Sequence, residues 1–146
     1  MKNAFILSAV TCLFFWNCKS KDYPLDDLPA DRITFGEGGG FTGQYTDWML
    51  LDSGQILERK GIGGDFVQIK KIKRKEVRQL YEKAAALSAE VMQEKPPGNY
   101  NYSLTVQRDS TELKATWSGQ SPIAPEVEEL YKSLRAQAKG VAVENK

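Results

Sequence analysis

The chain has 146 residues, with 20 basic and 19 acidic side chains and a formal net charge of +1 at pH 7. This length suits one domain with a modest core, and the balance of charge argues against a general nucleic-acid binder, which would show a basic excess. The sequence has no histidine, which excludes serine-histidine and cysteine-histidine catalysis, histidine-based zinc or copper sites and a histidine pH switch.

The first residues have the layout of a secretory signal. Lys2 supplies a positive charge, and residues 4–16 form a predominantly apolar block that is followed by the polar Asn17. A membrane-spanning helix needs about 20 apolar residues, so this block is too short to be retained as a transmembrane segment. We expect residues 1–17 to be removed on export.

Cys18 stands directly after this block and before the polar residues 19–22. This arrangement resembles the lipobox of bacterial lipoproteins, although residues 15–17 differ from the leucine and two small residues of that family's pattern. The resemblance covers residues 1–22 alone. It implies cleavage before Cys18, acylation of its thiol, and attachment to a membrane of the bacterial cell envelope. The membrane expected is the outer one, on its periplasmic or surface face. The alternative is an ordinary signal peptide with an incidental cysteine.

The cysteine count restricts the chemistry of the folded domain. Cys12 lies in the predicted signal and Cys18 would carry the lipid, so no thiol remains for a disulfide or a nucleophile. Residues 18–31 hold two prolines and many charges, and we expect them to form a flexible tether that lifts the domain off the membrane. Residues 32–139 are then a single domain and residues 140–146 a tail.

Alternating apolar and polar residues predict a first strand over residues 32–36, which leads into a glycine-rich stretch. Gly38, Gly40 and Gly43 match the G-x-G-x-x-G pattern of nucleotide-binding loops. A loop of the dinucleotide-binding kind opens a helix whose amino terminus faces the phosphates, whereas residues 44–52 have the pattern of a strand. We therefore expect no nucleotide, and we assign the glycines to a turn or bulge that uses positive φ.

A β-hairpin is predicted next. Residues 44–52 and 55–60 are two strand-like segments joined by a sequence typical of a tight turn, Asp52-Ser53-Gly54. Residues 61–65 form a further turn, and residues 66–72 form a short strand or an extended lead-in to a helix.

From about residue 74 the apolar residues recur with the spacing of an amphipathic helix, and the pattern continues to Val91. Pro96 and Pro97 stop this helix. The region is rich in basic residues: Lys70, Lys71, Lys73, Arg74, Lys75, Arg78 and Lys83. We interpret them as a solvated helix flank, with contact to anionic headgroups or peptidoglycan as the alternative.

The sequence of the second half of the domain predicts two strands and a helix. Residues 99–107 alternate large apolar with polar side chains, which indicates an antiparallel sheet with one buried and one wet face. Residues 108–111 turn the chain into a strand over residues 112–117. The last helix begins near Pro125 and ends at Gly140.

The predicted fold is α+β, an antiparallel sheet of about five or six strands with two amphipathic helices packed on one face. Three features resemble small lipoprotein domains of Gram-negative bacteria. These are the glycine-rich strand, the Asp-x-Gly hairpin, and a late helix in which Leu130 and Tyr131 follow Pro125. The likeness implies no particular activity.

Four carboxylates occur around the glycine turns, namely Glu37, Asp47, Asp52 and Asp65. They could supply an acid/base pair or a calcium site. However, no D-x-D-x-D-G run is present, and aspartate is common at turns for conformational reasons alone. We assign no catalytic residue, no metal and no cofactor.

The candidate binding surface consists of Trp48 together with Glu37 and Phe41. If the side of the second strand that carries Trp48 faces outward, it exposes an apolar patch of the kind found at contact surfaces. In the alternative, Trp48 points inward and its neighbours on the strand face out or contact the second helix. The strand is apolar on both sides near its end, so both arrangements stay open.

We expect a non-enzymatic cell-envelope lipoprotein whose domain binds another protein or a cell-wall component such as peptidoglycan. The alternative is a small envelope hydrolase or hydrolase inhibitor that uses carboxylates between Glu37 and Asp65. Two of these carboxylates in one cleft would favour the enzyme, and a flat apolar patch around Trp48 would favour the binding module.

The lipid anchor can be tested by the substitution Cys18→Ala. We expect this variant to accumulate as unprocessed precursor or to be shed from the membrane, because no thiol is left for acylation. Fractionation of cells and mass spectrometry of the product measure the effect. A variant that is processed and fractionates like the parent protein would show that Cys18 carries no lipid.

Overall fold

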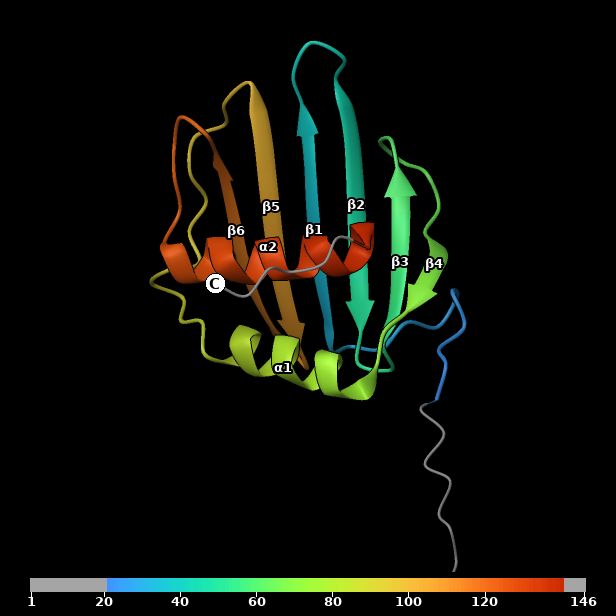
Figure 1. The fold of residues 1–146 in the computed structure, drawn as a ribbon. Coiled ribbons are helices and arrows are strands. Elements are labelled where there is room, and N and C mark those ends of the chain that lie inside the picture. Colours follow the sequence, from blue (N-terminus) through green and yellow to red (C-terminus); the bar gives the residue numbers. More distant parts are fainter. Residues whose placement is uncertain (1–20, 141–146) are drawn as a thin grey trace, which may run out of the picture.

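The computed structural model describes residues 21–140. They form one six-stranded antiparallel sheet in the order β4-β3-β2-β1-β5-β6, and two helices cover one face of it (Figure 1). In chain order the elements are β1 (Arg32–Gly39), β2 (Gln44–Leu51), β3 (Gln55–Lys60), β4 (Val67–Lys71), α1 (Arg74–Ala85), β5 (Tyr100–Arg108), β6 (Thr111–Ser118) and α2 (Pro125–Lys139). The predicted α+β fold is confirmed.

The main core lies between the sheet and the helices. On β1, Ile33 and Phe35 alternate with smaller residues and are both fully buried. The strand register places Trp48 of β2 and Leu104 of β5 on either side of Phe35. Helix α2 supplies the facing apolar side chains, including Leu130. Alternate residues of the strands and residues three or four positions apart on the helix therefore form one apolar cluster.

Helix α1 is shorter than the sequence predicted. It ends at Ala85, whereas the apolar spacing predicted helix as far as Val91. The following residues turn so that Leu87 and Met92 are buried in the core. The chain then runs beside β6, where the backbone N–H of Lys95 donates to the carbonyl of Thr116 at 2.8 Å. If α1 continued further, the edge strand β6 would lose this backbone pairing. The pairing with β6 therefore accounts for the end of α1 at Ala85.

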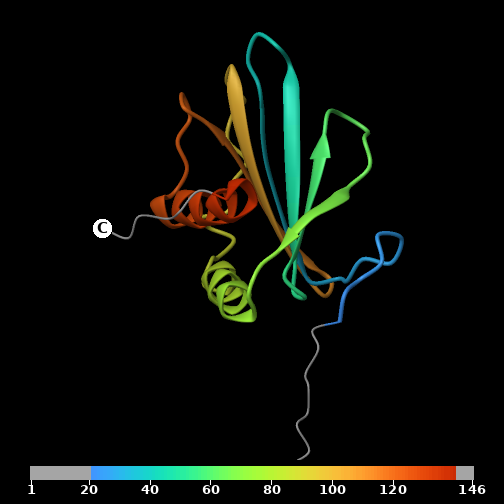
Figure 2. The same cartoon turned by 45° about the vertical axis from the view of Figure 1, so that its right-hand side comes forward.

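The face of the sheet away from the helices, here called the open face, carries a second apolar cluster. It consists of Met49, Leu51 and Leu57. Tyr23 and Leu28 pack against it, so the segment 21–31 lies along the sheet on the side opposite the helices (Figure 2). Residues 21–31 are the described part of the segment 18–31 that was expected to form a tether, and they pack on the sheet. The cause is β2, which is apolar on both sides near its end and needs a cover on each.

Hydrogen bonds reinforce this cover. Gln55 is only 2 % exposed, and its amide must find partners within the protein. The backbone N–H of Tyr23 donates to Gln55 Oε1 at 2.7 Å, and Gln55 Nε2 donates to the carbonyl of Tyr23 at 3.0 Å. Just before it, Asp22 forms an ion pair with Lys71 at the end of β4. The segment is thus held to the sheet from its first described residues.

The second helix follows the prediction closely. Pro125 occupies its first turn, and Gly140 ends it in the left-handed conformation with φ of 71°.

Within residues 21–140, neither helix is long and apolar enough to cross a bilayer. The predicted signal peptide, Cys18 and residues 141–146 lie outside the described residues.

The packing of the first segment can be tested by substituting its two leucines. We expect Leu28→Ala to lower the free energy of unfolding by about 1–2 kcal/mol, because part of a buried apolar contact is lost. Leu25 is 50 % exposed, and Leu25→Ala is the matched control with an expected change within about 0.5 kcal/mol. Urea denaturation measures both. Equal effects of the two substitutions would mean that the segment does not pack as described.

Candidate functional site

One carboxylate on the central strand binds three side chains of α2. Glu37 is 8 % exposed and points toward the helix. Its Oε2 accepts a hydrogen bond from the Tyr131 hydroxyl at 3.0 Å and one from Arg135 Nε at 2.7 Å. Its Oε1 accepts from Arg135 Nη2 at 3.1 Å and from Lys139 Nζ at 2.6 Å. The three partners are spaced by four residues, so one face of α2 presents them all to the same group.

This environment keeps Glu37 ionised. Burial by itself raises the pKa of the carboxyl, but the hydrogen bonds from Arg135, Lys139 and Tyr131 outweigh it, so the pKa lies below its ordinary value. The same contact raises the pKa of Arg135. An acid that is held as a carboxylate by two cations is a poor proton donor near neutral pH. Glu37 therefore suits a structural or binding role better than general-acid catalysis.

Four aromatic rings lie next to this network. Tyr102 stacks on Trp117 with ring centroids 5.6 Å apart, and the ring of Tyr131 meets both edge-on. Tyr100 meets Tyr102 edge-on at 5.5 Å and is 41 % exposed. Aromatic pairs in these arrangements contribute about 0.5–1.5 kcal/mol each beyond their buried area. The cluster is therefore a rigid platform whose outer ring is in contact with solvent.

A cleft of about 560 Å³ opens over this platform, between α2 and the ends of β5 and β6. We call it the aromatic cleft. Its rings are Tyr100, Tyr102, Trp117 and Tyr131, and its charged side chains are Glu37, Glu128, Lys132 and Arg135. Lys132 pairs with Glu128, while Arg135 and Lys139 share the single charge of Glu37. The four charged side chains that line the cleft therefore balance, and Lys139, which lies outside the lining, adds a second cation to Glu37.

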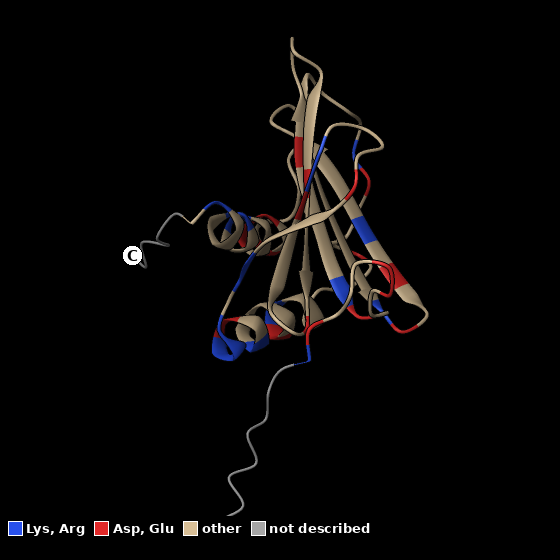
Figure 3. Ribbon diagram, turned by 90° about the vertical axis from the view of Figure 1, so that its right-hand side faces the viewer, with Lys and Arg blue, Asp and Glu red and all other residues tan. Residues whose placement is uncertain are grey.

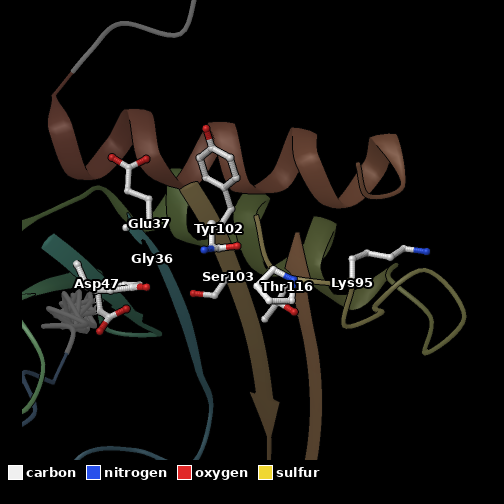
Figure 4. Close-up of a pocket in the computed structure, with 11 residues that line it drawn as sticks. Gly36, Glu37, Asp47, Lys95, Tyr102, Ser103 and Thr116 are labelled. Carbon is white, nitrogen blue, oxygen red and sulfur yellow. The ribbon is translucent and has the colours of Figure 1, made fainter. Parts of the chain in front are cut away.

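A second, smaller hollow of about 330 Å³ lies on the open face, where β1 has glycine at two alternate positions. Figure 4 shows that Glu37 and Tyr102 point toward α2, whereas Asp47 and Ser103 lie on the other side of the strands. A Cβ at Gly38 would approach Tyr45 Cδ1 to 2.4 Å, so the ring of the neighbouring strand covers the glycine. Asp47 is already paired with Arg59 at 2.8 Å. This glycine groove offers hydroxyl groups, a ring and the ammonium group of Lys95, whose hydrogen-bond partner is the neutral Gln93.

The three predicted binding residues have different surroundings. Trp48 is 2 % exposed, stacks on Phe35 and donates its indole N–H to Glu58 Oε2 at 3.0 Å. The arrangement with Trp48 outward is therefore wrong, because the register of β2 directs it into the main core. Glu37 is also buried, as part of the network above. Phe41 is fully exposed in the turn between β1 and β2, at the opposite end of the sheet from the β2–β3 turn (Figure 1).

The four candidate carboxylates do not converge. Glu37 faces α2, Asp47 faces the open side, and Asp52 lies in the turn between β2 and β3. Asp65 lies in the loop after β3, at the opposite end of the sheet from Asp52. Residues 21–140 contain no group of three or more acidic, histidine or cysteine side chains placed to hold a metal ion. Glu37 and Asp47 both line the glycine groove, but their side chains point to opposite sides of the sheet (Figure 4). Trp48 is buried, so the described residues show no exposed apolar patch around it.

Comparison with known proteins finds no family model that matches the chain and no match among curated proteins.

The partners of Glu37 were not predicted from the sequence, although two signals were available. Glu37 follows Ile33 and Phe35 at alternate positions, which directs its side chain to the same buried face. Tyr131, Arg135 and Lys139 repeat every four residues on the last helix. The first pattern indicates a buried acid, and the second indicates hydrogen-bond donors along one face of a helix. The sequence does not show that β1 and α2 are neighbours.

The network can be tested with Glu37→Gln. Because the pKa of Glu37 is lowered by folding, its contribution to stability is present above the unfolded pKa of about 4.3 and is lost as pH falls through the folded value. We expect the variant to be less stable by about 1–2 kcal/mol at pH 7, a modest figure because Arg135 and Lys139 are partly exposed. The difference from the parent protein should shrink below about pH 4.

Glu112→Gln is the matched control, since Glu112 is exposed on β6. Urea denaturation at several pH values measures both variants. A difference between the parent and Glu37→Gln that is the same at pH 3 and pH 7 would mean that the charge of Glu37 does not stabilise the fold.

Proposed function

We propose that this chain is a lipid-anchored protein of the bacterial cell envelope whose domain is a non-enzymatic binding module, and that its ligand occupies the aromatic cleft. The observation that carries the proposal is the cleft itself, in which exposed ring surface lies beside the partly exposed guanidinium group of Arg135. Ligand sites in proteins are concave, largely apolar, and contain a few placed polar groups. The aromatic cleft has this character.

The chemistry of the cleft favours an acidic saccharide of the cell wall. The rings of Tyr100 and Tyr102 offer apolar surface on which the C–H face of a sugar can stack. Arg135 has a side chain 43 % exposed, and its Nη1 makes no hydrogen bond within residues 21–140, so it can donate to a carboxylate of the ligand. Peptidoglycan fragments combine sugar rings with carboxylates.

A second candidate, contact with another envelope protein, is favoured by a different observation. Phe41 and Ile62 are 107 % and 89 % exposed, in the glycine-containing loops β1–β2 and β3–β4 at one end of the sheet. Large apolar side chains held fully in solvent are typical of contact surfaces. This surface is separate from the aromatic cleft, so the two candidates involve different residues. The hydrolase alternative has no such support, because the candidate carboxylates lie apart.

The proposed site is tested by calorimetric titration with soluble disaccharide-peptide fragments of peptidoglycan. We expect Tyr100→Ala to weaken binding about tenfold, which corresponds to about 1.4 kcal/mol of lost stacking. Tyr45→Ala is the matched control, because Tyr45 is similarly exposed but lies on the open face. Fragments with amidated carboxyl groups should bind more weakly than free acids. Absence of binding, or equal loss in both variants, would contradict the proposal.

A further inference from the structure

The first described residues leave little freedom between the domain and the preceding chain. Lys21 is followed by Asp22, which pairs with Lys71, and by Tyr23, which is hydrogen-bonded to Gln55. Both contacts lie at the end of the sheet where β4 leads into α1 (Figure 1). We call this the α1 end of the domain. The chain therefore meets the folded body at a fixed point at the α1 end, on the open face of the sheet.

The covalent distance from this point to Cys18 is short. Cys18 and Lys21 are three residues apart, and three residues span at most about 11 Å even when fully extended. A lipid on Cys18 would therefore hold Lys21 close to the headgroups of the bilayer. With residues 21–31 packed on the sheet, no long spacer is left to lift the domain away.

We infer that the domain stands directly on the membrane with the exposed side of α1 against anionic phospholipid headgroups. This inference rests on the proposed lipid on Cys18. It adds the orientation of the domain and a second membrane contact, which the anchor by itself does not supply.

The charge of α1 matches such a surface. Arg74, Lys75 and Arg78 are exposed on its first two turns, and Arg74 and Lys75 form no ion pair within residues 21–140. Arg78 is only loosely paired, with Glu82 at 3.8 Å. The three cations line a hollow of about 520 Å³ that contains one carboxylate, Asp52. Each such cation near an anionic bilayer contributes about 1 kcal/mol of attraction.

Helix α1 itself carries Glu76 and Glu82, but its four basic residues leave it with a net positive charge. Asp26 and Asp27 belong to the segment that covers the open face, on the side of the sheet away from the helices. Figure 3 shows basic positions, together with fewer acidic ones, on α1 at one side of this end. The domain should therefore tilt so that α1, rather than the first segment, touches the headgroups.

This orientation turns the candidate ligand sites away from the bilayer. The aromatic cleft lies at the ends of β5 and β6 where Tyr100 and Ser118 stand, opposite the α1 end. Phe41 and Ile62 lie at the same far end. Strand β1 has eight residues and spans about 26 Å, so these sites face whatever lies beyond the membrane surface.

The test uses the full protein, processed in a bacterial host and reconstituted into vesicles of phosphatidylethanolamine and phosphatidylglycerol. Two variants are made, Gln79→Cys in α1 and Ile62→Cys at the far end, and a fluorophore is attached to the introduced cysteine. In each variant this cysteine is the free thiol of the acylated mature chain. A spin label in the lipid headgroups quenches nearby fluorophores. We expect several-fold stronger quenching at position 79 than at position 62.

Charge is tested in the same preparation. Arg74→Glu combined with Lys75→Glu should reduce the quenching at position 79, because the attraction to phosphatidylglycerol is reversed. Lys60→Glu, at the far end of β3, is the matched control and should leave it unchanged. Replacing phosphatidylglycerol by phosphatidylcholine should have the same effect as the double substitution.

The outcomes separate the two proposals. A mass that shows an acylated Cys18, together with equal quenching at positions 79 and 62, overturns this inference and leaves the lipid anchor intact. Quenching at position 79 that is insensitive to charge also overturns the contact with anionic headgroups. A mature protein without a fatty acid overturns the anchor and the orientation together.

Discussion

Glu37 is the only buried charged residue within residues 21–140, and its contacts with α2 add to the apolar packing that holds this helix on the sheet. A buried carboxylate is stable only when its charge is compensated, and α2 compensates it with a hydroxyl, a guanidinium and an ammonium spaced by four residues. The contact sets how the helix lies over β1 and β5. The rings of Tyr131 and Trp117 then meet at one place, and the aromatic cleft forms beside them.

The central position of β1 gives the strand two different surroundings. Toward the helices it carries Ile33, Phe35 and Glu37, which belong to the core and the charge network. Toward the open face it carries glycines, over which side chains of β2 fold. Two hollows result, one on each side of the same strand. They differ in character, because four aromatic rings line the hollow on the helix side, whereas hydroxyl groups and Lys95 line the hollow on the open side.

The cover of the open face links the fold to the placement of the protein. Met49, Leu51 and Leu57 need an apolar cover, and Tyr23 and Leu28 supply it. A segment that would otherwise serve as a spacer is thereby used in folding. For a protein attached through Cys18, the same packing shortens the connection to the membrane and selects which end of the domain faces it. The binding sites that we propose then share the opposite end with the exposed loops.

The sequence by itself determined the fold class, the order of the elements and most of their ends, because alternation and helical spacing are local patterns that each segment carries alone. It also excluded histidine and thiol chemistry in the folded domain. Only the tertiary structure decided that Trp48 is buried, that α1 ends at Ala85, that residues 21–31 pack on the sheet, and that Glu37 meets Arg135. Each of these depends on which segments distant in sequence become neighbours. β2 is apolar on both faces, so its own pattern does not say which face meets the helices, and the partners of Glu37 lie about 100 residues further along the chain.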